Sequence, residues 1–111
     1  MSEPYLPPER SPTREEVDRM PGLVVLDFGT NWCGICRGAA PRIEAAFLDH
    51  PEVRHVKVED GPGQPLGRSF RVRLWPNLVF LRDGAVVRQL VRPKDDELRE
   101  AFAALTAPVA S

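Results

Sequence analysis

The sequence predicts a single α/β domain in which a central mixed sheet of four strands is flanked by helices. The chain has 111 residues, which suits one domain with one hydrophobic core. Short strand-like apolar runs alternate with segments of helical periodicity, and this alternation requires a parallel pair of strands joined by a crossover. The last two runs are joined by the sequence RDG at residues 82–84, which predicts an antiparallel hairpin.

The chain begins with a segment that contains three of its twelve prolines. Residues 1–10 are expected to form an extended, partly mobile lead-in. A short helix should follow, because Ser11 suits an N-cap, Pro12 suits the first helical position, and acidic residues occupy the first turn. This helix should end at Pro21-Gly22.

The first strand and the longest helix carry the chemistry-bearing residues. Residues 23–28 form an apolar run broken only by Asp27, as expected for a strand buried on both faces. A helix is predicted from the cysteine motif to about Asp49, since Pro51 cannot continue it, and Pro41 should kink it. One stripe of this helix should face the core: Cys36, Ala40, Ile43 and Phe47.

The remaining elements follow from simpler patterns. Further strands are predicted at residues 53–58, 77–81 and 85–91. A loop rich in glycine and proline precedes a short helix around residues 65–70. The closing helix, residues 94–105, has acids in its first turn and one apolar face formed by Leu98, Phe102 and Leu105.

Composition excludes several classes of partner. The formal net charge is −1 and the arginines are scattered among acids, so neither nucleic acid nor a membrane surface is predicted as a partner. No segment approaches the roughly 20 apolar residues that cross a bilayer. The polar, proline-rich start also lacks the apolar core of a signal peptide, so the expected location is cytoplasmic.

The only two cysteines lie in the sequence FGTNWCGICR, as Cys33 and Cys36. A disulfide staple across two residues would constrain the unfolded chain very little, and reducing compartments disfavour permanent disulfides. A redox centre or a metal site therefore fits the pair better than a staple does. Of these two, the redox centre is the prediction, with no metal and no cofactor, and the metal site is kept as an alternative.

The spacing gives the two thiols unequal surroundings. Cys33 should lie at the N-terminus of the helix, where free backbone N–H groups favour its thiolate form, while Cys36 belongs to the buried stripe. Cys33 would attack a disulfide in a partner, and Cys36 would then resolve the mixed disulfide. Asp27 is a candidate acceptor for the Cys36 proton, since a buried carboxylate becomes a better base. The alternative is that Asp27 points outward at the end of its strand.

The segment VVLDFGTNWCGICRGAAPRIEAAF resembles the active-site strand, motif and helix of the thioredoxin superfamily. Four features match in order: Asp27 six residues before Cys33, Trp32 directly before it, the CxxC itself, and Pro41 five residues after Cys36. RVRLWPNLVFLRDGAVV resembles the later cis-proline loop, strand and hairpin. The resemblance covers about residues 12–106. It implies a thioredoxin-like fold with the family's first strand missing, a lead-in at residues 1–10, a domain at 11–107 and a tail at 108–111.

The resemblance also implies roles and partners. It makes Cys33 the nucleophile, Cys36 the resolving thiol and Asp27 the proton carrier of a protein-disulfide oxidoreductase. The partners would be protein disulfides or dithiols and a reductase or other electron donor. Substrate-binding residues would be Trp32, Gly34, Ile35, Trp75 and the cis-proline Pro76, with the backbone of Trp75 pairing with the substrate chain. Alternative readings are a strand-start role for Pro76 and a core position for Trp32.

The sequence departs from the family pattern in ways that leave the direction of electron flow open. The dipeptide between the cysteines is Gly-Ile instead of the Gly-Pro of thioredoxin, and these residues influence the redox potential. Reductant, oxidant and isomerase are therefore all compatible with the motif. The other departures are Gly29 in place of a tryptophan, Asn77 in place of a threonine, and Val91 with Arg92 near a usual glycine.

Two other classes of function are compatible with the cysteine pair. Cys33, Cys36, His50 and His55 have the spacing of some zinc sites, but a helix from 36 to 49 would separate His50 from Cys36 by about 21 Å. In that case His50 would end the helix and His55 would be an exposed strand residue. An iron–sulfur cluster that bridges two subunits, with one cysteine ligand from each, is a related alternative. A non-catalytic binding or adaptor module would keep the fold and lose the turnover.

Overall fold

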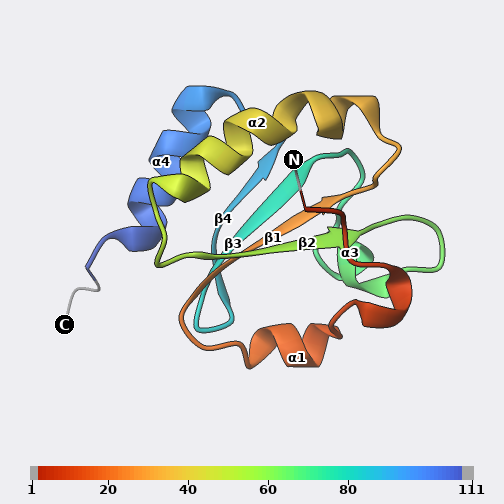
Figure 1. Cartoon of the computed structure of the whole chain (residues 1–111). Coiled ribbons are helices and arrows are strands. Elements are labelled where there is room, and N and C mark those ends of the chain that lie inside the picture. The colour runs from red at the N-terminus through yellow and green to blue at the C-terminus, as the bar shows by residue number, and fades with distance from the viewer. Residues whose placement is uncertain (1–2, 109–111) are drawn as a thin grey trace.

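The computed structural model describes residues 3–108 (Figure 1). Residues 1–2 of the predicted lead-in and residues 109–111 of the predicted tail lie outside the described part. In chain order the elements are a 3-10 turn at Pro8–Arg10, α1 (Arg14–Asp18), β1 (Leu23–Gly29), α2 (Gly34–Leu48), β2 (Arg54–Glu59), α3 (Pro65–Ser69), β3 (Asn77–Arg82), β4 (Ala85–Val91) and α4 (Asp95–Thr106).

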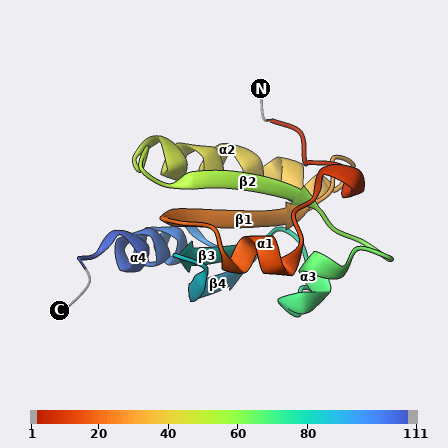
Figure 2. The same ribbon diagram turned by 90° about the horizontal axis from the view of Figure 1, so that it is seen from below.

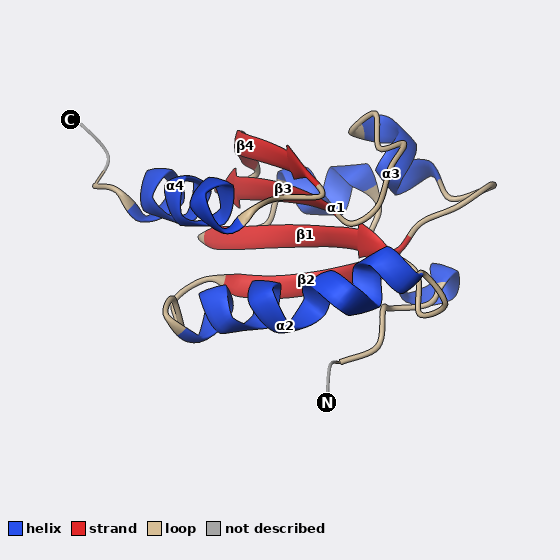
Figure 3. Cartoon of the chain, turned by 90° about the horizontal axis from the view of Figure 1, so that it is seen from above, coloured by secondary structure: helices blue, strands red, loops and turns tan. Residues whose placement is uncertain are grey.

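The four strands form one mixed sheet, as the sequence predicts. The strand order is β2-β1-β3-β4, with β1 parallel to β2 and antiparallel to β3, and with β3 antiparallel to β4 (Figure 3). The crossover from β1 to β2 runs through α2, which is the connection that a parallel pair requires. The fold class is therefore confirmed.

Helices cover both faces of the sheet. The helices α2 and α4 pack on one face, and α1 with α3 pack on the other, which is the near face in Figure 2. Alternation along β1 divides its side chains between two cores. Val24, Leu26 and Phe28 belong to the α1/α3 core, whereas Val25 belongs to the α2/α4 core. Asp27 and Gly29 follow Val25 at intervals of two and share its face.

The start of α1 differs from the sequence prediction. The N-cap is Thr13, whose side-chain oxygen accepts the Glu16 N–H at 3.1 Å while the Glu16 carboxylate accepts the Thr13 N–H at 2.9 Å. Ser11 as the N-cap is wrong, because only Thr13 has a Glu three residues later to complete this capping box. Ser11 instead ends the 3-10 turn in an extended conformation.

The N-terminal segment pairs with the free edge of the sheet. The Leu6 N–H donates to the Lys57 carbonyl at 2.8 Å, and the Leu6 carbonyl accepts the Glu59 N–H at 3.0 Å. The sequence predicts that the family's first strand is missing, and in its place the structure has a single parallel bridge between Leu6 and Val58. It directs Leu6 into the α1/α3 core and Tyr5 to the opposite face, under α2.

The helices are short relative to a bilayer. In the part of the chain from residue 3 to residue 108, no helix has both the length and the apolar character needed to cross a membrane.

Candidate active site

The first cysteine lies between the end of β1 and the start of α2. Cys33 is the N-cap of α2, with an extended backbone, and its Sγ accepts the Cys36 N–H at 3.2 Å. The side chain is partly exposed. The Cys33 sulfur therefore faces the free amide end of a fifteen-residue helix, where a negative charge is favoured.

The second cysteine lies one turn further along and is enclosed. Cys36 is 2% exposed and packs against Gly29 and the sheet. Burial raises the pKa of the Cys36 thiol to about 11, and the hydrogen bond with Cys33 acts in the same direction. Both sulfurs are free thiols in the structure. The unequal surroundings that the sequence predicts are present: one thiol is reachable at a helix end, and the other is shielded.

Asp27 is buried beside the cysteine pair. It is 2% exposed, so the alternative that it points outward is wrong. Its Oδ2 lies 2.8 Å from Nε2 of His55, and its Oδ1 accepts a hydrogen bond from the Tyr5 hydroxyl at 3.4 Å. Two neighbours from separate segments therefore hold the two oxygens of this carboxylate.

His55 is a site residue that the sequence analysis placed incorrectly. It is half-buried, not exposed, and its ring stacks on Phe47 of α2 with centroids 3.8 Å apart and planes 4° apart. The position follows from the parallel register, which pairs His55 with Val25 and so directs both side chains toward α2. The alternation of residues 53–58 alone leaves that direction undetermined.

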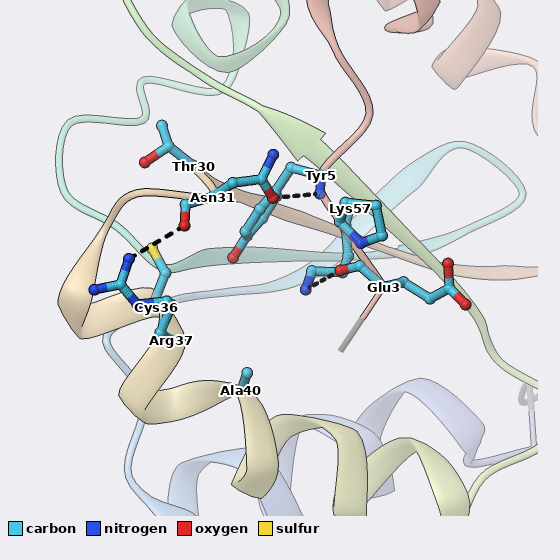
Figure 4. Close-up of a pocket in the computed structure, with 9 residues that line it drawn as sticks. Glu3, Tyr5, Thr30, Asn31, Cys36, Arg37, Ala40 and Lys57 are labelled. Carbon is cyan, nitrogen blue, oxygen red and sulfur yellow. Dashed lines mark hydrogen bonds between the residues drawn. The ribbon is translucent and has the colours of Figure 1, made fainter. Parts of the chain in front are cut away.

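Tyr5 is a second site residue that the sequence analysis missed. It is 8% exposed, and its ring lies between β2 and α2 with the hydroxyl end directed toward Cys36 (Figure 4). Burial raises the pKa of the phenol far above its usual range, and the charge of Asp27 and the Cys36 sulfur add to this effect. The one feature of the sequence that could have indicated a role for Tyr5 is that the only tyrosine of the chain lies in a polar, proline-rich segment.

The loop before β3 completes the site from the other side. The antiparallel register pairs Phe28 with Asn77, which brings Trp75-Pro76 to the end of β1 where the cysteine motif begins. The Trp75-Pro76 bond is cis, as predicted. The indole N–H of Trp75 donates to the buried Asp60 carboxylate at 2.8 Å, and Nε of Arg92 donates to the Trp75 carbonyl at 2.8 Å.

Apolar side chains are exposed around the reachable thiol. Trp32 is 70% exposed, so a core position is wrong, and its ring meets the ring of Trp75 edge-on at 5.8 Å. Ile35 is 50% exposed and Gly34 is also exposed, whereas Pro76 is buried. The predicted substrate-binding residues thus come from the start of α2, with the residue before Cys33, and from the loop before β3, although Pro76 offers little surface of its own.

A cavity of about 440 Å³, lined by residues other than those of this apolar surface, reaches Cys36. It is lined by Glu3, Pro4, Tyr5, Thr30, Asn31, Cys36, Arg37, Ala40 and Lys57 (Figure 4). The Lys57 ammonium lies 4.4 Å from the centre of the Tyr5 ring and donates to the Glu3 carbonyl at 2.7 Å. The cavity gives solvent a route to the neighbourhood of Cys36.

The histidines of the zinc alternative are engaged elsewhere. His50 stacks on Phe102 of α4 at 4.8 Å, and His55 pairs with Asp27. Between residues 3 and 108, no three His, Cys, Asp or Glu side chains gather in a way that could hold a metal ion.

Comparison with known proteins agrees with this geometry. The sequence model of the thioredoxin family matches residues 9–104. The H-type thioredoxin of Picea mariana is 33% identical over 98 residues, which cover 88% of this chain and 78% of that protein. The H-type thioredoxin of Ricinus communis is 33% identical over 82 residues, covering 74% and 70%.

Solved structures give the same assignment. The reduced form of thioredoxin 2 from Pseudomonas aeruginosa matches with a TM-score of 0.83 and 51% identity, covering 95% of this chain and 96% of that chain. Fasciola hepatica thioredoxin matches with a TM-score of 0.67 and 32% identity, covering 78% and 83%. With its buried carboxylate, its CxxC at a helix N-terminus and its cis-proline loop, this chain belongs to the thioredoxin family, whose members are thiol–disulfide oxidoreductases.

Proposed function

We propose that this protein exchanges electrons with protein disulfides through the dithiol/disulfide couple of Cys33 and Cys36, and that the reaction passes through a mixed disulfide. The observation that carries the proposal is the difference between the two thiols. Cys33 is partly exposed and receives an amide N–H at its sulfur, whereas Cys36 is 2% exposed with a pKa raised to about 11. Such a pair separates attack from resolution.

In the reducing direction the Cys33 thiolate attacks one sulfur of the partner disulfide. A new S–S bond joins Cys33 to the partner, and the second partner sulfur leaves with the electron pair of the broken bond. Cys36 then loses its proton, with Asp27 as acceptor, and attacks the Cys33 sulfur. The partner leaves as a dithiol, and Cys33 and Cys36 are left as a disulfide that has given up two electrons.

The partner chain is proposed to dock on the surface beside Cys33. Trp32, Gly34 and Ile35 supply exposed area next to the sulfur, and the backbone of Trp75, followed by Pro76, supplies polar groups. The 2.8 Å hydrogen bond from Trp75 to Asp60 supports this role, because it anchors the loop. An extended segment of a protein fits such a surface better than a small disulfide does.

Turnover requires that the Cys33–Cys36 disulfide be reduced again. A reductase or another electron donor is therefore the second proposed partner. The proposed compartment is the cytoplasm, where thiols are kept reduced. The proposed catalytic domain is residues 11–107, to which the lead-in contributes Tyr5.

The test is insulin reduction with a chemical reductant, using the wild type and two single variants. Cys33→Ser should abolish the activity, because no attacking thiol is left at the helix end. Cys36→Ser should instead accumulate a mixed disulfide that runs at a higher mass on a non-reducing gel and disappears with added thiol. If both variants reduce insulin at the wild-type rate, the proposed mechanism is wrong, and the adaptor alternative gains support.

A further inference from the structure

The Tyr5 hydroxyl is a buried polar group that has no role in the mechanism proposed above. Three contacts fix its side chain and the adjoining backbone. Leu6 is paired with β2, the Tyr5 N–H donates to Oδ1 of Asn31 at 3.0 Å, and the ring lies under the Lys57 ammonium. Because these contacts come from β2 and from the loop before Cys33, the position of the hydroxyl is tied to the active site.

The absence of a side chain at Gly29 makes room for this arrangement. A Cβ atom placed on Gly29 would lie 2.6 Å from the Tyr5 hydroxyl oxygen and 2.7 Å from the Cys36 sulfur. The two atoms therefore occupy the same small space over the end of β1. A real Cβ cannot approach other atoms this closely, so any residue other than glycine would displace one of them.

The hydroxyl lies between the buried thiol and the buried carboxylate. On one side is Cys36, and on the other Oδ1 of Asp27 accepts its hydrogen bond at 3.4 Å, which is long for an O–H···O bond. His55 holds the opposite oxygen of Asp27 at 2.8 Å. A carboxylate only accepts hydrogen bonds, so His55 donates to Oδ2 while Asp27 is charged, and Oδ1 stays turned toward Tyr5.

We propose that the Tyr5 hydroxyl relays the Cys36 proton to Asp27 during the resolving step, with His55 as the positioning residue for Asp27. The proposal rests on the proposed function, because it assigns a proton path to one of its steps. The Tyr5 oxygen takes the proton of the Cys36 thiol and gives its own proton to Oδ1 of Asp27. The Cys36 electron pair forms the bond to Cys33, and the partner sulfur leaves as a thiolate that takes a proton from water.

The surroundings of Tyr5 keep its hydroxyl protonated, as a group that passes on a proton requires. The pKa of Tyr5 is raised far above its usual range, so the phenol remains a donor throughout the physiological pH range. Among residues 3–108, the ionisable groups around the relay are Glu3 in the N-terminal segment, Cys33 at the N-cap of α2, Arg37 on α2, Asp27 on β1, and His55 and Lys57 on β2.

The experiment follows the two half-reactions separately. Reduced protein is mixed in a stopped-flow instrument with less than one equivalent of dithiobis(nitrobenzoate), whose thiolate product is coloured. The first release reports the attack of Cys33, and the second reports the attack of Cys36 on the mixed disulfide. Tyr5→Phe removes only the hydroxyl and keeps the ring under Lys57.

In Tyr5→Phe the second release should slow by about tenfold or more at neutral pH, and the first should stay within about twofold of wild type. The rate of the second release should then rise by about tenfold per pH unit, because hydroxide entering by the cavity becomes the acceptor. The wild-type rate should depend on pH less steeply between about pH 6 and about pH 9. A purely structural role for Tyr5 would leave the shape of the pH profile unchanged.

Two further variants make the result specific. Thr30→Val removes another fully buried hydroxyl near Cys36, one with no hydrogen-bond partner among the described residues, and should leave both releases unchanged. Gly29→Ala keeps the tyrosine but places a methyl group against both its hydroxyl and the Cys36 sulfur, so it should slow the second release as Tyr5→Phe does. The double variant that combines Tyr5→Phe with Gly29→Ala should give a second release no slower than that of either single variant. If Gly29→Ala fails to fold, Tyr5→Phe alone decides.

The relay is overturned if Tyr5→Phe matches the wild type in the rate and pH profile of the second release, or if Thr30→Val slows that release equally. Failure of the proposed function has a different signature. In that case Cys36→Ser would still give the second release, whatever residue stood at position 5.

Discussion

Nε2 of His55 on β2 lies 2.8 Å from Oδ2 of Asp27 on β1, and the ring of this histidine is stacked on Phe47 of α2. The carboxylate is 2% exposed, so it has no access to bulk water that could replace this partner. A buried oxygen left without a hydrogen bond loses its solvation without compensation. The histidine therefore contributes both to stability and to the orientation of Asp27.

His55→Phe should lower the free energy of unfolding by roughly 1–3 kcal/mol, because it keeps an aromatic ring against Phe47 but leaves Asp27 Oδ2 unsatisfied. Urea unfolding at neutral pH measures this change. The matched control is His50→Phe, which alters a histidine that is likewise stacked on a phenylalanine, Phe102. That variant should stay within about 0.5 kcal/mol of wild type. Equal losses in the two variants would contradict the role given to the Asp27 contact.

The reduced protein should lose stability at alkaline pH because of Cys36. Its thiol ionises near 9.0 in the unfolded chain and near 11 in the folded protein, so the folded state holds the proton more tightly. The resulting stabilisation is fully present below about pH 9 and is lost as the pH rises toward 11. Its size is roughly 1–3 kcal/mol.

Urea unfolding at about pH 8 and about pH 10.5, with reductant present, measures this loss. Cys36→Ala should show a smaller decrease between the two pH values than wild type, because no thiol then ionises at that site. A variant that loses as much stability as wild type over this interval would show that the alkaline effect arises elsewhere.

Tyr5 is the only tyrosine, so the ultraviolet absorbance of tyrosinate reports this residue alone. In the folded protein the absorbance change should begin well above the ordinary tyrosine pKa, because burial and the neighbouring Asp27 oppose a second negative charge. In strong denaturant the same titration should return to about pH 10. A folded protein that titrates at the ordinary value would place the phenol in water, contrary to the structure.

Arg92 should limit access of substrate to the backbone of Trp75. Its side chain donates to the Trp75 carbonyl at 2.8 Å, the group that a docking chain would use under the proposed function. Arg92→Ala should therefore lower KM for insulin by about two- to tenfold and leave the reaction with dithiobis(nitrobenzoate) unchanged. Arg88→Ala, which alters an exposed arginine paired with Glu100, is the control. An unchanged or higher KM in Arg92→Ala would contradict this account.

The parts of the fold that follow local patterns were predictable from the sequence. The apolar run of residues 23–28, the RDG hairpin and the proline-bounded helix after Cys33 each fix an element with little reference to the others. Ser11 and Thr13 are both good caps in isolation, and only the reach of Glu16 to Thr13 decides between them.

The residues around Asp27 depend on contacts between distant segments. His55 lies there because of the register between β1 and β2, which alternation within one strand does not specify. Tyr5 lies there because the lead-in pairs with the edge of β2 and because Gly29 leaves space over β1. In the sequence, glycine at position 29 shows only that no side chain is present there. The neighbouring residues do not indicate which distant side chain occupies the space over Gly29.

The edge pairing of Leu6 also determines how this protein should be shortened for further work. The family match starts at residue 9, four positions beyond Tyr5, so a fragment trimmed to that boundary would retain both cysteines and lose the phenol. Such a fragment would pass for a whole thioredoxin by sequence search. Under the proposed relay, the fragment would resolve its mixed disulfides more slowly than the longer chain.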